Sequence, residues 1–142
     1  MTNAMIGSIG AALKTEFGER YKVYREEKKQ GLTEPCFFIQ CLALTEKLFF
    51  NKRYRRSGQF CIQYLPKDKL HGDQECRAVA ERLFDCLGWL GVDGDLVMGT
   101  KMRYEVVDGV LHFFVDYDLF IYKGAGSVPV MGEITGETRM KG

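Results

Sequence analysis

The segments KMRYEVV (101–107) and VLHFFVDYDLFIY (110–122) are joined by the dipeptide Asp108-Gly109. A two-residue Asp-Gly loop between alternating segments is typical of a type I′ β-hairpin. The turn also sets the register, because the two residues that flank it must face each other. The predicted pairs are Val107–Val110, Val106–Leu111, Glu105–His112, Tyr104–Phe113, Met102–Val115 and Lys101–Asp116. One face then collects the apolar residues Met102, Tyr104, Val106, Leu111, Phe113 and Val115.

Two segments outside this hairpin have the spacing of amphipathic helices. The first covers about residues 4–17, with Thr2 or Asn3 as its N-cap and Gly18 as its C′ residue. The second follows Asp73, which we predict to be its N-cap, and ends at Gly88. Its apolar stripe consists of Cys76, Val79, Ala80, Leu83, Phe84 and Leu87.

Strands are predicted at 20–27, 36–44 and 53–66, where β-formers alternate or run continuously. We expect residues 45–52 to form a loop with an apolar tip, and the Gly- and Asp-rich residues 91–99 to be a connector. The predicted fold class is α+β, a mainly antiparallel sheet with two helices packed on one face, in the order α-β-β-β-α-β-β.

The chain of 142 residues fits one domain, which we place at 1–123. Residues 124–142 are Gly-rich and poor in large apolar side chains, and we expect a tail or arm that orders only in an assembly. A net charge of +1 argues against a dedicated nucleic-acid binder or a membrane-surface protein. The sequence has no apolar run long enough for a transmembrane helix, and its first residues lack signal-peptide features.

Residues for catalysis or metal binding do not form a recognisable pattern. The five cysteines include no CxxC pair, and neither His71 nor His112 has a zinc-site spacing. Most of the cysteines lie in apolar patterns, and we expect reduced, structural thiols. The predictions are therefore no enzyme activity, no metal and no cofactor.

A basic cluster at 52–56, interleaved with Tyr54, is the densest positive segment. It is compatible with a solvated surface strand, with a protein interface rich in Arg and Tyr, or with phosphate contacts to nucleic acid. Together with the apolar tip and the tail it supplies the candidate assembly contacts, which are Leu48, Phe49, Phe50, Lys52, Arg53, Arg55, Arg56, Val128, Val130, Met131 and Ile134.

Four sequence segments, in this order along the chain, resemble those of a known protein family. They are IGAAL (9–13), YKVYREEKKQGLTEPCFFI (21–39), NKRYRRSGQFCIQYLP (51–66) and GTKMRYEVVDGVLHFFVDYDLFIYK (99–123). The sequence over about 5–123 resembles phage tail terminator proteins, in particular those carried in prophages of Gram-positive bacteria and in phage-tail-like particles.

The resemblance implies a structural virion protein without a cofactor. Its members form a ring, commonly a hexamer, at the head-proximal end of the tail tube, where the ring ends tube polymerisation and offers a surface for head-tail joining. The implied partners are further copies of the chain, the tail tube protein, a neck or connector protein and, in contractile systems, the sheath protein. Another neck or head-tail adaptor protein is the main alternative, and a nucleic-acid-binding module is a second one.

Overall fold

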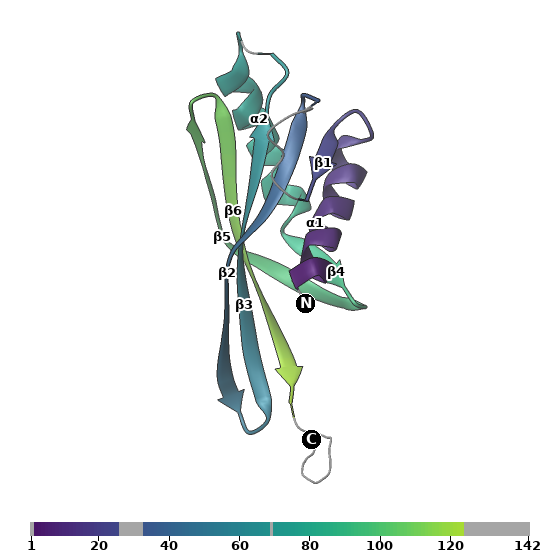
Figure 1. Cartoon of the computed structure of the whole chain (residues 1–142), viewed down its shortest axis with the longest axis vertical. Coiled ribbons are helices and arrows are strands. Elements are labelled where there is room, and N and C mark those ends of the chain that lie inside the picture. The colour runs from purple at the N-terminus through teal and green to yellow at the C-terminus, as the bar shows by residue number, and fades with distance from the viewer. Residues whose placement is uncertain (1, 26–32, 69, 124–142) are drawn as a thin grey trace. The chain divides into compact units, whose positions relative to one another are not determined.

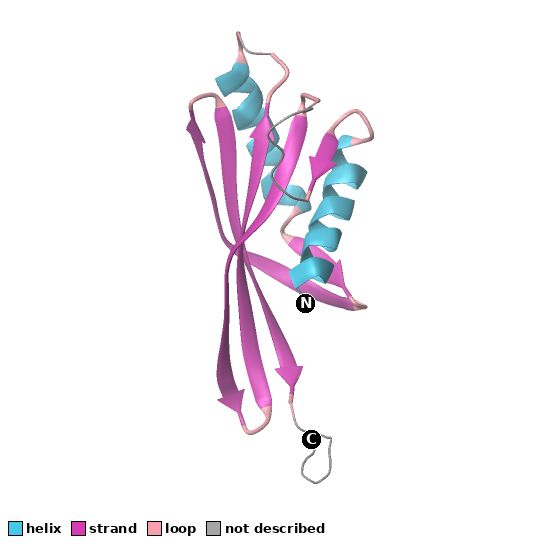
Figure 2. Ribbon diagram, in the orientation of Figure 1, coloured by secondary structure: helices cyan, strands magenta, loops and turns pink. Residues whose placement is uncertain are grey.

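The computed structural model describes residues 2–25, 33–68 and 70–123. Their elements, in chain order, are α1 (Thr2–Phe17), β1 (Lys22–Tyr24), β2 (Cys36–Phe50), β3 (Arg53–Leu65), α2 (Gly72–Cys86), β4 (Trp89–Val92), β5 (Asp95–Val107) and β6 (Val110–Tyr122) (Figure 1). The strands form one mostly antiparallel sheet in the order β1-β2-β3-β6-β5-β4, with both helices on one face (Figure 2). The predicted α+β class is confirmed.

The chain divides into two compact units. The core unit comprises residues 1–43 and 58–117, and it contains both helices. The second unit comprises residues 44–57 and 118–142, and its described part consists of the end of β2, the start of β3 and the end of β6. We call this described part, 44–57 and 118–123, the hairpin unit.

The β5–β6 hairpin has the predicted turn and, near the turn, the predicted register. Asp108 and Gly109 both have positive φ, as a type I′ turn requires. Val107 pairs with Val110, and Glu105 pairs with His112. The predicted register fails further from the turn, because an irregularity lies between Thr100 and Arg103.

This irregularity changes the residue pairs in the part of the hairpin that is far from the turn. Asp116 pairs with Thr100, whereas we predicted Lys101, and Lys101 takes a positive φ of 53°. An extra residue on one strand shifts every later pair by one position and leaves that residue outside the ladder. The predicted pair of Lys101 with Asp116 is therefore wrong, and the predicted pair of Met102 with Val115 falls within the irregularity.

Strand β4 occupies part of the segment that we predicted as a connector. It pairs with β5 in antiparallel fashion from Trp89↔Met98 to Val92↔Asp95. The turn between them is again an Asp-Gly dipeptide, Asp93-Gly94, with φ of 50° and 87°. The connector prediction for 91–99 is wrong because the same turn chemistry joins β4, a strand of only four residues, to the start of β5.

The helices meet the sheet through the predicted apolar stripes. Met5, Ile9 and Leu13 of α1 are fully buried, and Gly18 ends this helix with a φ of 88°. Thr2 and Asn3 lie inside α1, so the predicted N-cap positions are wrong. Near its end, α1 contacts Arg82 of α2, whose guanidinium carbon lies 4.2 Å from the centroid of the Phe17 ring.

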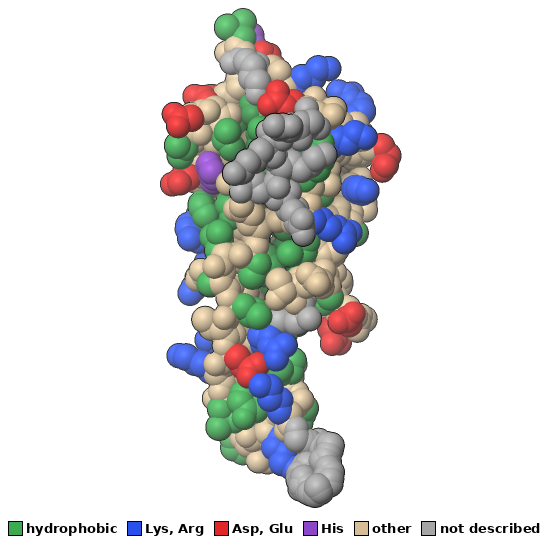
Figure 3. All heavy atoms as spheres, in the orientation of Figure 1, with side chains coloured by type: hydrophobic (Ala, Val, Ile, Leu, Met, Phe, Trp, Pro, Cys, Tyr) green, Lys and Arg blue, Asp and Glu red, His purple; other side chains and the backbone are tan. Residues whose placement is uncertain are grey.

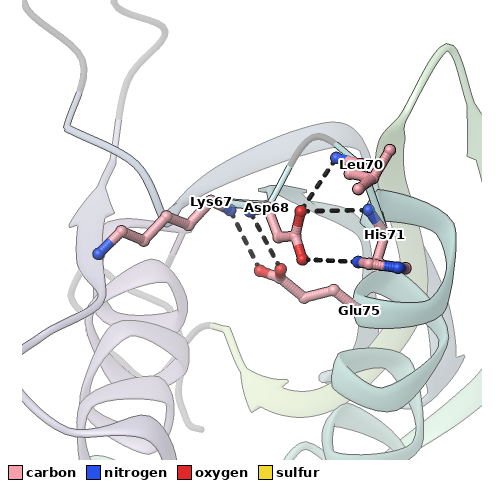
Figure 4. A network of polar contacts seen from close by, with 5 residues as sticks. All are labelled: Lys67, Asp68, Leu70, His71 and Glu75. Atoms are coloured by element: carbon pink, nitrogen blue, oxygen red, sulfur yellow. Dashed lines mark hydrogen bonds and ion pairs between the residues drawn. The ribbon is translucent and has the colours of Figure 1, made fainter.

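The start of α2 differs from the predicted Asp73 cap. The N-cap residue is His71, and its side chain makes no capping hydrogen bond. Two carboxylates secure the turn instead (Figure 4). Asp68 accepts hydrogen bonds from the backbone N–H groups of Leu70 (3.0 Å) and His71 (3.2 Å), and Glu75 accepts them from those of Lys67 (3.2 Å) and Asp68 (3.3 Å).

Residues 45–52 do not form the predicted loop. Strand β2 continues to Phe50 and β3 begins at Arg53, so only Asn51 and Lys52 form the turn. Asn51 has a φ of 56°, a conformation that Asn tolerates better than most residues. The apolar residues that we placed at a loop tip are strand residues of the hairpin unit.

The end of α2 is tied to β5 and β6 in the core unit. The buried Tyr117 hydroxyl donates a hydrogen bond to the Leu87 carbonyl oxygen (2.5 Å), and the Gly99 N–H donates to the Gly88 carbonyl (2.7 Å). A Cβ on Gly99 would lie 2.7 Å from the Leu87 carbonyl oxygen and 3.0 Å from Val115 Cγ2. This junction therefore requires glycine at position 99.

We predict that Gly99→Ala lowers the free energy of unfolding by about 1–3 kcal/mol, because backbone must move to admit the methyl group. Urea unfolding followed by circular dichroism measures the change. Gly91→Ala is the matched control, because no atom lies within 4 Å of its added Cβ. We expect the control to be neutral or up to about 1 kcal/mol more stable. Equal stability of the two variants would contradict the steric role of Gly99.

Candidate assembly surface

Side chains of the hairpin unit project from two faces, because successive residues of a strand alternate. The side-chain contacts show which residues share a face. Phe49, Arg53 and Phe120 contact one another, and we call their side the aromatic face. Alternation adds Lys47, Arg55 and Tyr122 to it. The opposite side is called the ionic face, and it carries Leu44, Glu46, Leu48, Phe50, Tyr54, Arg56, Leu119, Ile121 and Lys123.

The aromatic face is built around an arginine. The rings of Phe49 and Phe120 meet edge to face, with centroids 5.0 Å apart. The guanidinium carbon of Arg53 lies 5.7 Å from the Phe49 centroid and 5.2 Å from the Phe120 centroid. Cation–π contacts of this kind hold the charge against the rings and do not neutralise it. The face is therefore both apolar and positive.

The ionic face is built around Glu46. Arg56 donates from Nε (2.9 Å) and Nη2 (2.7 Å) to one carboxylate oxygen, and Lys123 binds the other. Lys123 Nζ also lies 4.7 Å from the centroid of the Tyr54 ring. Hydrogen bonds from Lys123 and then Arg56 hold the pKa of Glu46 below its usual value of 4.5. These contacts join β2, β3 and β6 on this face.

Large apolar side chains are exposed on both faces of the hairpin unit. Leu48 and Phe50 are 60% and 70% exposed on the ionic face, and Phe49 and Tyr122 are 58% and 71% exposed on the aromatic face. Figure 3 shows hydrophobic side chains interleaved with lysine and arginine in this unit. Apolar surface of this kind on a few strand ends is typical of a protein interface.

The predicted contact residues are thus divided between two faces. Leu48 and Phe50 lie on the ionic face, and Phe49 lies on the other. Arg53 stacks on aromatic rings, Arg56 pairs with Glu46, and Arg55 is exposed. Lys52 lies in the turn, where its carbonyl accepts a hydrogen bond from the Lys123 N–H (2.9 Å). The predicted tail contacts Val128, Val130, Met131 and Ile134 lie outside the described residues.

The end of β6 contributes residues that the sequence reasoning missed. Phe120 completes the aromatic face, Lys123 completes the ionic face, and Tyr122 is the most exposed aromatic residue in the described chain. The signal was present in Leu119-Phe120-Ile121, where apolar residues occupy both alternating positions. Such a run on a strand end predicts apolar surface on both faces.

A second exposed apolar group lies in the β4–β5 hairpin of the core unit. Trp89, Leu96 and Met98 are 60%, 74% and 51% exposed. Trp89 pairs directly with Met98, and Leu96 pairs with Gly91. Their neighbours Leu90, Val92 and Val97 are buried, so the three exposed side chains share the opposite face. We call these three residues the β4–β5 patch.

The histidines and thiols of the described chain have structural surroundings. His112 lies opposite Glu105, as predicted, and its Nδ1 is 3.4 Å from Gln63 Nε2. All five cysteines are free, and burial raises the pKa of Cys61 to about 11 and that of Cys86 to about 12. A thiol with so high a pKa is a poor nucleophile near neutral pH.

Two further searches cover only residues 2–25, 33–68 and 70–123. Within these ranges, no group of three or more His, Cys, Asp or Glu side chains could hold a metal ion. Neither helix described there is long and apolar enough to cross a membrane.

The exposed strand ends indicate the class of protein, and a family model gives the family. A sheet whose strand ends expose large apolar side chains is typical of a protein that associates with other proteins. A family model described as phage tail terminator protein matches residues 5–128. The chain therefore belongs to the phage tail terminator family, a family of structural proteins of phage tails.

The other comparisons add no functional information. No curated protein matches the sequence. A solved structure is similar over 89% of this chain and 99% of its own, at 10% identity and a TM-score of 0.41. A score this low supports no argument about fold or function.

We predict that the Glu46 carboxyl titrates below pH 4.5 and that its pKa rises toward 4.5 in Lys123→Gln and, less, in Arg56→Gln. A depressed native pKa means that the contribution to stability is present above pH 4.5 and is lost as pH falls through the native value. Side-chain carboxyl 13C shifts measure the titration.

Lys47→Gln is the matched control, because it removes a neighbouring positive charge from the opposite face. We expect the control to leave the pKa of Glu46 nearly unchanged. A Glu46 titration that is equally insensitive to all three substitutions would contradict the ionic cluster.

Proposed function

We propose that this chain is a structural virion protein that caps the head-proximal end of the phage tail tube as a ring. The ring ends tube polymerisation and presents the surface to which the neck joins. Its partners are further copies of the chain, in a ring of six, the tail tube protein and a neck or connector protein. In contractile tails the last sheath ring is a further partner. The chain assembles in the bacterial host and acts without catalysis.

The mechanism follows from the requirements of a growing tube. Each tube ring leaves strand edges and loops uncovered at the growing end, and the next ring covers them. A terminator must match that surface on one side and present a different surface on the other, so that no further tube ring can add. It must also contact its neighbours around the ring. The subunit therefore needs several distinct interfaces on a small chain.

The proposal rests mainly on the surface of the hairpin unit. Its strand ends expose apolar residues on both faces, including Phe49 on one face and Phe50 on the other. The two faces also differ in charge, because Glu46 is paired with Arg56 and Lys123 on only one of them. Two chemically different faces on one sheet can serve two different partners.

The arginine contacts favour a protein interface over nucleic-acid binding. Arg53 contacts two phenylalanine rings, and Arg56 is bound by a carboxylate. Phosphate binding would have to compete with these contacts. Arginine among aromatic side chains is instead the composition found at the energetic centres of protein interfaces.

We predict that deleting the gene from its producing element gives tails of uncontrolled length, which electron microscopy of purified particles would reveal. The wild-type gene supplied in trans should restore a uniform length, and a gene carrying Phe50→Ser should restore it poorly. Truncation of an interface aromatic residue commonly costs about 2 kcal/mol or more, a weakening of about 30-fold.

Leu70→Ser is the control for this experiment, because Leu70 is 85% exposed in the core unit. It should restore tail length as well as the wild type does. Tails of normal length that still attach to heads in the deletion strain would refute termination. Normal tails that fail to attach to heads would indicate another neck protein.

A further inference from the structure

Large exposed hydrophobic side chains are concentrated in two places in the described chain. Six of these side chains belong to the hairpin unit: Leu44, Leu48, Phe49, Phe50, Phe120 and Tyr122. Three more form the β4–β5 patch in the core unit. Each group is larger than the scattered single residues that are normal on a soluble surface. Both groups are thus candidate interaction surfaces.

The two groups carry opposite charge. The described hairpin unit has six basic and two acidic side chains, an excess of four positive charges. Residues 83–100, which include the β4–β5 patch, contain Asp85, Asp93 and Asp95 and no Lys or Arg. Asp93 and Asp95 are exposed beside the patch. A chain with a net charge of only +1 is thus strongly polarised between two apolar surfaces.

The aromatic face is the side of the hairpin unit that matches the patch. Its positive charges, Lys47, Arg53 and Arg55, face Asp118 alone on that side, whereas Glu46 neutralises charge on the ionic face. Arginine, tyrosine, phenylalanine, tryptophan and methionine are the residues enriched at interface centres. Most residues of the aromatic face are of these types, and so are Trp89 and Met98 of the patch.

Charge also disfavours a symmetric contact, in which the same surface of two copies would meet. Two hairpin units brought together would repel each other, and so would two copies of the acidic β4–β5 region. The complementary pairing joins different surfaces of two copies. Such a contact is heterologous, and heterologous contacts between identical subunits close into rings or continue into filaments.

We propose that the aromatic face of one copy binds the β4–β5 patch of a second copy, with the cationic hairpin unit against Asp93 and Asp95. This inference deepens the proposed ring by naming its lateral contact, and it rests on that proposed function only for its biological role. Association through this contact weakens as salt is raised, because the rim charges are screened.

Two double variants test the contact. Arg55→Thr/Tyr122→Thr removes exposed groups from the aromatic face, and Leu96→Thr/Met98→Thr removes them from the patch. Threonine keeps the β-propensity of these strand positions. Native mass spectrometry and light scattering over a concentration series should show wild-type oligomers, and each double variant alone should associate at least about 30-fold more weakly.

A mixture of the two double variants gives the decisive result. Each keeps the surface that the other lacks, so one intact contact forms per pair. We expect 1:1 heterodimers and no larger species, with 15N labelling of one variant to distinguish the masses. Leu70→Thr/Val107→Thr, which removes two exposed apolar residues elsewhere in the core unit, is the control and should associate like the wild type.

The inference is overturned by a wild-type chain that stays monomeric throughout the series, or by a mixture that forms no heterodimer. It is also overturned if only one of the double variants loses association, since both surfaces belong to the same contact. Failure of the proposed function is distinguishable. Heterodimers together with normal tails in the deletion strain would retain the contact and reject termination, whereas uncontrolled tails without heterodimers would do the reverse.

Discussion

The hydrogen bond from the Tyr117 hydroxyl to the Leu87 carbonyl fixes the end of α2 on the sheet. This carbonyl is one of the unsatisfied groups at a helix C-terminus, and leaving it buried without a donor would cost about 1–3 kcal/mol. The chain can turn from α2 into β4 here because Gly99 has no side chain. The pairing of β4 with β5, and hence the position of the β4–β5 patch, depends on this close approach.

The hairpin unit is stabilised in a different way. Its described side-chain contacts include Arg53 against two rings and Glu46 between two cations. Exposed cation–π contacts and ion pairs of this kind contribute little to stability. Three strands need a hydrophobic face packed against something for independent stability, and here the apolar residues remain exposed on both faces. Burial of these residues in the proposed ring would add to this stabilisation.

The sequence predicted the parts of the fold in which one face of an element is buried. The stripes of α1 and α2 and the Asp108-Gly109 hairpin follow the periodicities that burial of one face imposes. The failures have physical reasons. Asp93-Gly94 has the same turn chemistry, but β4 has only four residues, and the apolar run Leu96-Val97-Met98 of β5 does not alternate. The bulge at Lys101 has no sequence signal, because its residue types suit a regular strand equally well.

The same reasoning explains why the candidate surface was only partly predictable. The sequence predicts Leu48, Phe49 and Phe50 as contact residues but in a loop, because an apolar run without alternation does not fit a half-buried strand; the structure places them in β2. Alternation marks a strand with one face in the core and one in water. A strand with both faces available to protein partners has no reason to alternate. The absence of alternation in 48–50 and 119–121 thus corresponds to apolar residues on both faces of these strand ends.

A cap on a tube also constrains how its subunits can meet. The end of a growing tube is polar, so every subunit of a terminating ring must present the same side to the tube. An isologous contact would relate neighbours by a two-fold axis and turn alternate subunits upside down. A heterologous contact lets all subunits keep one orientation and gives the ring two different sides. The opposite charges of the hairpin unit and the Asp93–Asp95 region oppose the first arrangement and favour the second. In the proposed ring, the uneven charge of a nearly neutral chain is thereby linked to the polarity that termination requires.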